Sequence, residues 1–467
     1  MAFGKKRVPT PKEDRLPFFR FMAWKSSDIT AAAAFLLCTN YLAMFCTDFL
    51  GLAPATVGTI LLVSNIVDFF TDFAAAIIVD NTNTKIGRGR PYELSIVGLS
   101  ICTMLLFATP AGWNQIVKIL WVFFVYTFAF GVFNTLRSAA VNPYTIRAWK
   151  NNRKVIGKIH SYGGIVSTLG AMVVSVTFPT MMAKMATSAK GWLPLVAMYM
   201  VPLMLIGTLR FIFVKEDTSV ETEKHEKVNV KAILGMMKKN KYAWMFMAII
   251  FLFNTITSMG TITYYWKYIV GDTSMMGIVS IFGTLLLPLM VIFPQLLKKF
   301  SAPQLIAAAT VVSAAGYVMN FFAGDNVPML LGAGVLSAMA MLPISYLGFM
   351  IIMDLASYNE YIGIPRMEAS IGAIFFGFGE QLGQGVGAAL TGFMLSAAGY
   401  IAAEGEAVVA QPDGVIAMIR TLHSFVPALL MVLIGIMAVM LSKLSKQMPQ
   451  MEKEIAERKM EAPADNK

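Results

Sequence analysis

The sequence predicts an all-α membrane protein with twelve transmembrane helices in two six-helix bundles. Of its 467 residues, 57% are hydrophobic and only 14% are charged, about half the charge that a soluble domain carries. Apolar runs of roughly 20 residues, each long enough to cross a bilayer, recur from Ile29 to Leu441. We place the spans at residues 29–49, 55–79, 93–111, 116–140, 159–183, 192–214, 242–266, 274–297, 302–323, 328–352, 368–397 and 415–441.

The positions of lysine and arginine predict which connections face the cytoplasm. Basic residues crowd residues 5–25, before the first span, and follow even-numbered spans, as in residues 147–158, whereas the connections 47–56 and 323–328 contain none. Because these side chains mark the cytoplasmic side, we expect a multi-pass protein of the cytoplasmic (inner) membrane with both termini cytoplasmic. The net charge of +11 is then a topology signal, and we expect membrane lipid but no nucleic acid as a partner. The span-length apolar segment near the N-terminus argues against a cleavable signal peptide.

The largest internal connection follows the sixth span and divides the spans six and six. We expect a cytoplasmic N-terminal tail (1–28), an N-terminal six-helix bundle (29–214), a cytoplasmic middle loop (215–241), a C-terminal six-helix bundle (242–441) and a cytoplasmic C-terminal tail (442–467). This layout resembles that of major facilitator transporters.

The second span carries two acidic residues near the middle of the membrane. Asp68 and Asp72 are four residues apart, so they share one helix face. A charge there costs about 2.5–3.5 kcal/mol on insertion scales, and two like charges also repel each other. The pair therefore indicates a coupling-cation site, either a bound sodium ion or a proton, since carboxylates suit hard cations. The alternatives are a structural pair neutralised by a basic residue such as Arg137, or a water-filled pore without coupling.

The seventh and eleventh spans carry the other unusual side chains. Tyr264, Tyr265 and Trp266 close the seventh span, where we expect an interfacial aromatic belt rather than stacking partners for a sugar ring. Glu380 and Gln381 lie in the middle of the eleventh span. Intramembrane acids are usually functional, so Glu380 has a solute or proton role or pairs with Arg137.

Two long motifs resemble the glycoside–pentoside–hexuronide:cation symporter family, the melibiose permease-like carriers of the major facilitator superfamily. They are "NIVDFFTDFAAAIIVDNTNTKIGRGRPYEL" (65–94) and the stretch that starts "DLASYNEYIGIPR" (354–366). The resemblance implies a twelve-helix cation:solute symporter with a central cavity between two bundles. It also implies that two acids of the second helix and a threonine of the fourth bind the cation, and these match Asp68, Asp72 and Thr127.

The solute positions depart from the family pattern. Where the family has charged or aromatic solute ligands, this chain has Phe130, Asn134, Ser161 beside His160, Gln381, and Ala32 with Asp28 one turn earlier. Because sugars are distinguished by polar contacts to their hydroxyl groups, we expect a larger or more apolar glycoside, such as one with a hydrophobic aglycone. The candidate solute-binding residues are Asp28, Phe130, Asn134, Arg137, His160, Glu380 and Gln381.

The connection after the second span holds a candidate conformational clamp. Asp80, Lys85, Arg88 and Arg90 lie where transporters of this architecture keep charges that cap helix ends. These charges pair with acids in the loops after the fourth or tenth span. The alternative is plain positive-inside charge.

These observations predict a secondary active transporter that couples entry of sodium or a proton to uptake of a glycoside by alternating access. We expect a monomer with no cofactor beyond the coupling ion, and no enzyme, because no nucleophile–base or metal constellation is present. The alternatives are a proton-coupled carrier or exporter of a non-sugar amphiphilic solute, and a non-transporting membrane sensor.

Overall fold

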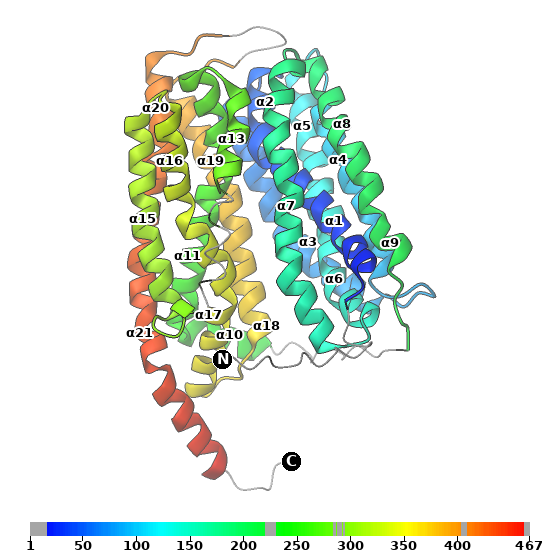
Figure 1. The fold of residues 1–467 in the computed structure, drawn as a ribbon, viewed down its shortest axis with the longest axis vertical. Coiled ribbons are helices and arrows are strands. Elements are labelled where there is room, and N and C mark those ends of the chain that lie inside the picture. The colour runs from blue at the N-terminus through cyan, green and yellow to red at the C-terminus, as the bar shows by residue number, and fades with distance from the viewer. Residues whose placement is uncertain are drawn as a thin grey trace, which may run out of the picture.

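The two halves of the chain form two bundles of helices that stand side by side (Figure 1). The structure, a computed structural model, describes residues 16–219, 230–283, 286, 292, 295–402 and 409–461. Within these residues the regular structure is helical, apart from an isolated bridge between Thr84 and Gly87. The predicted fold class is confirmed. We call the bundles the N bundle and the C bundle.

The N bundle contains the helices up to residue 213. They are α1 (Phe18–Leu37), η2 (Cys38–Leu42), α2 (Ala43–Asp48), α3 (Pro54–Asn81), η3 (Arg90–Leu94), α4 (Ser95–Phe107), α5 (Gln115–Thr127), η4 (Phe128–Asn134), α6 (Thr135–Ala148), α7 (Arg153–Met185), α8 (Ala189–Gly207) and α9 (Leu209–Phe213).

The C bundle contains the remaining helices. They are α10 (Val230–Lys239), α11 (Lys241–Ser258), α12 (Thr261–Tyr265), η5 (Trp266–Val270), η6 (Thr273–Met275), α13 (Met276–Gly283), α15 (Ala302–Ala323), α16 (Val327–Ser337), η8 (Ala338–Ala340), α17 (Met341–Tyr361), α18 (Glu368–Ile371), η9 (Gly372–Gly377), α19 (Phe378–Ala397), α20 (Asp413–His423) and α21 (Phe425–Glu461).

Local sequence explains where several helices begin. The side chains of Asn114, Asn152, Asn240 and Asn326 accept hydrogen bonds from backbone N–H groups in the first turns of α5, α7, α11 and α16. Such caps satisfy donors that a helix start otherwise leaves unpaired. Pro54 occupies the first turn of α3, where a missing N–H costs nothing.

Four π-helical segments, η2, η4, η5 and η9, interrupt the long helices. Segments of this kind are rare and occur frequently at functional sites. The segment η4 directly follows Thr127, and η9 ends just before Glu380 and Gln381. Two of the four therefore adjoin predicted site residues.

Ten helical stretches of the described residues are long and apolar enough to cross a membrane. The predicted eighth span lies partly outside the described residues. The predicted eleventh span is helical over residues 368–397, but it is not among the ten. At the chain ends the helices exceed the predicted spans, since α1 begins at Phe18, inside the segment 1–28, and α21 continues to Glu461.

The bundles contact each other closely at one end of the molecule, which we call the Asp48 end; the opposite end is the Arg90 end. There α3 packs against α19, and a Cβ added to Gly58 would lie 2.9 Å from the Ala389 Cα. The Ala55 N–H donates to Ser396 Oγ across the interface at 2.9 Å. Beyond Asp72, toward the Arg90 end, α3 exposes large side chains such as Ile77, which is 64% exposed.

Candidate functional site

Asp68 lies on α3 where that helix meets the π-helical segment η4. Its side chain is 7% exposed, and its Oδ1 has no hydrogen-bond partner among the described residues. A Cβ added to Gly131 of η4 would collide with this oxygen, so a glycine is needed for so close an approach. A buried carboxylate oxygen without a donor is uncommon in proteins, and it marks a place where a cation fits.

Asp72 lies one turn further along α3 and contacts the other bundle. The Gln381 Nε2 of α19 donates a hydrogen bond to Asp72 Oδ2. The other amide atom, Gln381 Oε1, is buried and has no hydrogen-bond partner among the described residues. Gln381, which the sequence predicts to bind solute, therefore contacts the predicted cation pair.

Thr127, the last residue of α5, contacts α3 one helical turn before Asp68. Its Oγ1 donates to Ser64 Oγ at 3.1 Å, and Ser64 is fully buried. Ser64, Asp68 and Asp72 are spaced by four residues, so they line one face of α3. Ser64 is a site residue that the sequence reasoning missed, although this spacing could have identified it.

The oxygen atoms around Asp68 and Asp72 form a ligand set that suits a hard cation held by two carboxylates. Among the described residues no three His, Cys, Asp or Glu side chains converge as a metal site. The groups near Asp68 and Asp72 include the hydroxyls of Ser64, Thr127 and Thr135 and the amide of Gln381. Oxygen atoms of these kinds are ligands for hard cations.

A second group of charges lies inside the N bundle. The Asp28 carboxylate contacts Lys25 Nζ at 2.9 Å, Arg137 Nη1 at 3.2 Å and Arg210 Nη2 at 2.5 Å. Arg210 also contacts Glu93 at 3.1 Å, and both of these side chains are fully buried. Three cations thus meet two anions, and the Asp28 side chain is 25% exposed. We call these five residues the Asp28 cluster.

Arg137 does not contact Glu380, the partner that one of the sequence-based alternatives gave it. Besides Asp28, Arg137 donates to Asn134 Oδ1 at 3.2 Å, whereas Glu380 accepts from Gln384 Nε2 at 3.5 Å on its own helix. The structure therefore contradicts the alternative in which Glu380 pairs with Arg137. That alternative was drawn from composition, which does not specify which helices are neighbours.

The remaining candidate solute residues are separated. Phe130 is 6% exposed and packs against Tyr126, with ring centroids 4.8 Å apart. The backbone of His160 lies in α7, but its side chain is outside the described residues. The structure thus brings Asp28, Arg137 and Asn134 together and places Glu380 and Gln381 on the other bundle.

Of the four candidate clamp residues, Arg88 and Arg90 bond to an acidic side chain, whereas Asp80 and Lys85 lie exposed. The backbone N–H groups of Arg88 and Arg90 donate to Glu216, at 2.8 and 2.5 Å, and Arg147 contacts the same carboxylate at 3.8 Å. Asp80 and Lys85 are exposed. The acid follows α9 within the same bundle, whereas the prediction places it in the loops after the fourth or tenth span.

Asp48 connects the two bundles and was missed by the sequence reasoning. It is 3% exposed and accepts hydrogen bonds from Lys267, from Tyr268 at 2.9 Å and from Tyr400, all of the C bundle. Thr47 of the N bundle also donates to it, at 2.8 Å. We call Asp48, Lys267, Tyr268 and Tyr400 the Asp48 lock.

The aromatic residues at the end of the seventh span belong to the same region. Tyr264, Tyr265 and Trp266 are 2%, 0% and 2% exposed, so the prediction of an interfacial belt is wrong. Tyr264 shares a hydrogen bond of 3.1 Å with Thr47 across the two bundles. Their burial follows from bundle contact, which the sequence pattern does not reveal.

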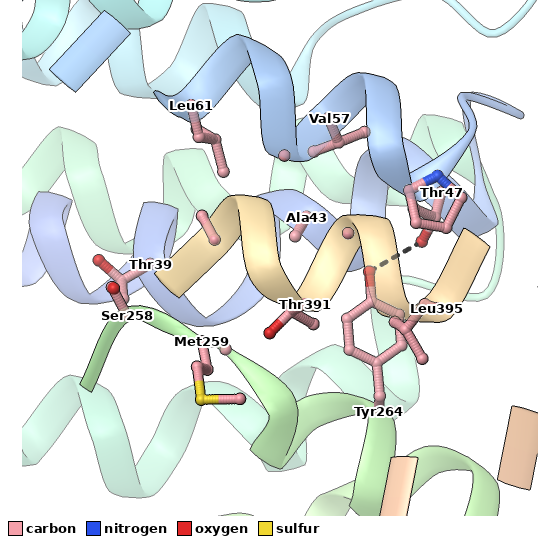
Figure 2. Close-up of a pocket in the computed structure, with 15 residues that line it drawn as sticks. Thr39, Ala43, Thr47, Val57, Leu61, Ser258, Met259, Tyr264, Thr391 and Leu395 are labelled. Atoms are coloured by element: carbon pink, nitrogen blue, oxygen red, sulfur yellow. Dashed lines mark hydrogen bonds between the residues drawn. The ribbon is translucent and has the colours of Figure 1, made fainter. Parts of the chain in front are cut away.

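A cavity lies between the bundles beside this contact. Figure 2 shows Thr39, Ala43 and Leu61 facing Ser258, Met259 and Thr391 across it, with Tyr264 and Thr47 joined at one side. The lining consists of apolar and hydroxyl-bearing residues. The predicted solute residues lie further toward the Arg90 end.

Comparisons with known proteins agree with this architecture. The family described as MFS/sugar transport protein matches residues 25–445. The isoprimeverose transporter of Lactiplantibacillus pentosus is 26% identical over 408 residues, which cover 84% of this chain and 82% of that protein. The glucuronide carrier protein homolog of Escherichia coli (strain K12) is 23% identical over 462 residues, which cover 95% and 97%.

Solved transporter structures share the fold at low sequence identity. A structure described for proton-dependent oligopeptide transporters matches with a TM-score of 0.64 at 13% identity, covering 92% of this chain and all of that one. A nucleoside transporter matches with a TM-score of 0.61 at 14% identity, covering 93% and 100%. The family match over nearly the whole chain also confirms the resemblance stated from the motifs. The chain belongs to the MFS/sugar transport protein family and is a membrane transporter, not an enzyme.

Proposed function

We propose that the protein is a secondary active symporter that couples cation entry to uptake of a glycoside or related sugar derivative. Relatives named as an isoprimeverose transporter and a glucuronide carrier homolog support a sugar-type solute. Alternating access between two bundles supplies the mechanism. The protein works as a monomer in the lipid of the cytoplasmic membrane.

The distribution of basic residues supports an orientation. The Arg90 end carries Arg88, Arg90 and Arg147, whereas the connection 47–56 at the Asp48 end has neither lysine nor arginine. By the positive-inside rule the Arg90 end and both termini face the cytoplasm. The Asp48 end then faces outward, and the closed bundle contact there corresponds to an inward-facing conformation.

The buried, unpartnered Asp68 Oδ1 is the observation that carries the proposed coupling. An acceptor at this depth needs either a proton or a metal cation, since no donor of the described residues reaches it. Asp68 and Asp72 bind the cation, and supporting oxygen ligands come from Ser64, one turn along α3, and from Thr127, which bonds to Ser64. Sodium fits the oxygen-only donor set.

Thermal unfolding of the purified protein tests the coupling ion. Sodium, lithium and choline chlorides are compared at constant ionic strength for the wild type and for Asp68→Asn. A cation that binds only the folded state at 100 times its Kd stabilises it by about 2.7 kcal/mol. We expect a sodium- or lithium-specific rise in the unfolding midpoint of the wild type that Asp68→Asn abolishes.

Asp413→Asn is the matched control, because that carboxylate is exposed at the start of α20. It should keep the wild-type cation response. If the wild type responds equally to sodium, lithium and choline, sodium coupling is wrong and a proton-coupled carrier takes its place. Flux driven by an imposed pH gradient then tests that alternative.

The Asp28 cluster favours a solute with an acidic group. It contains three cations and two anions, and Asp28 is partly exposed. The surplus positive charge supports binding of a carboxylate or sulfonate. Relatives named as a glucuronide carrier homolog and a putative sulfoquinovose importer agree with an acidic sugar.

A further inference from the structure

Gln381 lies where the close contact between α3 and α19 ends. From the Asp48 end inward the contact joins Pro54 with Gly392, Gly58 with Ala389 and Leu62 with Gly385. The hydrogen bond between Gln381 and Asp72 comes next. Beyond it α3 is largely exposed, with Phe73 at 49% and Ile78 at 50%. The amide and the neighbouring rings of Phe69 and Phe378, whose centroids are 4.5 Å apart, thus form the inner end of the bundle interface.

Two buried acceptors at this level have no donor. Asp68 Oδ1 belongs to the N bundle and Gln381 Oε1 to the C bundle, and neither has a hydrogen-bond partner among the described residues. Asp72, which accepts from Gln381, is one helical turn from Asp68. Carboxylate and amide oxygens are both ligands of hard cations, and these two acceptors come from different bundles.

We propose that Gln381 completes the cation site, so that the bound cation bridges the two bundles. This inference rests on the proposed function, which assigns the cation to Asp68 and Asp72. In the structure the Gln381 N–H group donates to Asp72. With a cation present, a half-turn of the amide presents Oε1, since an amide offers a donor and an acceptor in nearly the same shape.

A neutral amide ligand favours a metal ion over a proton. A proton needs only one carboxylate, whereas sodium or lithium gains from each added oxygen ligand. The ligand also belongs to α19, which moves relative to α3 when the bundles rock. Cation occupancy is thereby linked directly to contact between the bundles, which is how a coupling ion can shift a conformational equilibrium.

Sodium titrations of the full-length protein test this role, with the unfolding midpoint as the readout and choline holding ionic strength constant. We expect Gln381→Leu to raise the half-maximal sodium concentration by about tenfold or more, the range seen when a metal-site partner is removed. Gln381→Glu should lower it, because the added carboxylate is a charged ligand. Gln381→Asn keeps an amide on a shorter side chain, and it should also weaken sodium binding. This variant replaces Gln381→Leu as the test if the leucine variant fails to fold.

Gln384→Leu is the matched control, because Gln384 lies one turn along α19 and bonds to Glu380. It should keep the wild-type sodium dependence. If the Leu, Asn and Glu variants of Gln381 all titrate like the wild type while Asp68→Asn abolishes the response, Gln381 is no cation ligand and the cation pair stands. If the wild type shows no sodium response, the proposed coupling fails and this inference fails with it.

Discussion

At the scale of single residues, the charges inside the N bundle gather in the Asp28 cluster and not at the positions that match the family's solute ligands. The positions that match family solute ligands are largely uncharged here, yet Lys25, Arg137 and Arg210 converge on Asp28 from three helices. Arg210 is fully buried and also contacts Glu93, so its role is structural. Arg137 has the partly exposed Asp28 and Asn134 as partners, which makes it the better candidate for solute contact.

Arg137→Gln tests whether the cluster binds an acidic solute. The variant removes one charge and leaves Asp28 paired with Lys25 and Arg210, so it should fold. We expect about tenfold weaker binding of phenyl β-glucuronide, equal to about 1.4 kcal/mol, because a charge-assisted hydrogen bond is lost.

Phenyl β-glucoside, which has the same aglycone and no carboxylate, is the control ligand. Its affinity, measured by isothermal titration calorimetry, should change less than that of the glucuronide. Equal losses of affinity for the two ligands would show that Arg137 does not recognise the acidic group.

At the scale of elements, α19 uses different faces for its two neighbours. Gly379 and Gly383 face α11, where a Cβ at Gly379 would lie 3.0 Å from the Met247 carbonyl oxygen. Gly385 and Gly392 face α3 of the other bundle. Small residues let helix backbones approach closely inside a membrane. The glycines that the sequence offers therefore serve both packing within the C bundle and contact between the bundles.

Gly383→Ala should destabilise the protein. A Cβ there collides with the Phe251 carbonyl oxygen and lies 2.9 Å from the Asn254 Cβ, and overpacking of this kind costs about 1–3 kcal/mol. Gly377→Ala is the control, since its nearest neighbour is the Gly372 carbonyl oxygen at 3.7 Å. Thermal unfolding in detergent measures both, and equal midpoints would contradict the packing argument.

At the scale of the whole molecule, the Asp48 lock holds the two bundles together at one end. Its carboxylate belongs to the N bundle, and its cation and two phenols belong to the C bundle. Opening this end requires all of these contacts to break. The lock therefore stabilises the conformation described here relative to one that is open at the Asp48 end.

Asp48→Asn should shift the protein toward a conformation open at the Asp48 end, which is outward-open in the proposed orientation, because the charge that pairs with Lys267 is removed. A cysteine placed at Ala43, which lines the cavity of Figure 2, reports the opening once Cys38, Cys46 and Cys102 are replaced. We expect a membrane-impermeant maleimide to react about fivefold faster or more from outside intact cells, the lower end of typical coupling energies.

Asp272→Asn is the control for this experiment. Its carboxylate lies in the same half of the chain as Lys267 but accepts a hydrogen bond from the Ser274 N–H at 2.8 Å, within the C bundle. Labelling at the wild-type rate is expected. An unchanged rate in Asp48→Asn as well would rule out a locking role.

Local pattern was sufficient for several features of this protein. The apolar runs predicted the helical membrane fold, and the four-residue spacing placed Asp68 and Asp72 on one helix face. Both follow from the geometry of a single helix, in which residues four apart are neighbours and span length is fixed by bilayer thickness. The sequence by itself therefore determined which segments are helices and which acids share one helix face.

Contacts between helices could not be obtained in this way. Gln381 meets Asp72 across 309 positions of the chain, and Tyr400 meets Asp48 across 352. The alternative that paired Arg137 with Glu380 and the predicted interfacial position of Tyr264 were wrong for the same reason. Only the tertiary structure decided these partners, because they depend on which helices pack together and at what angle, and helix periodicity is the same whatever the neighbours are.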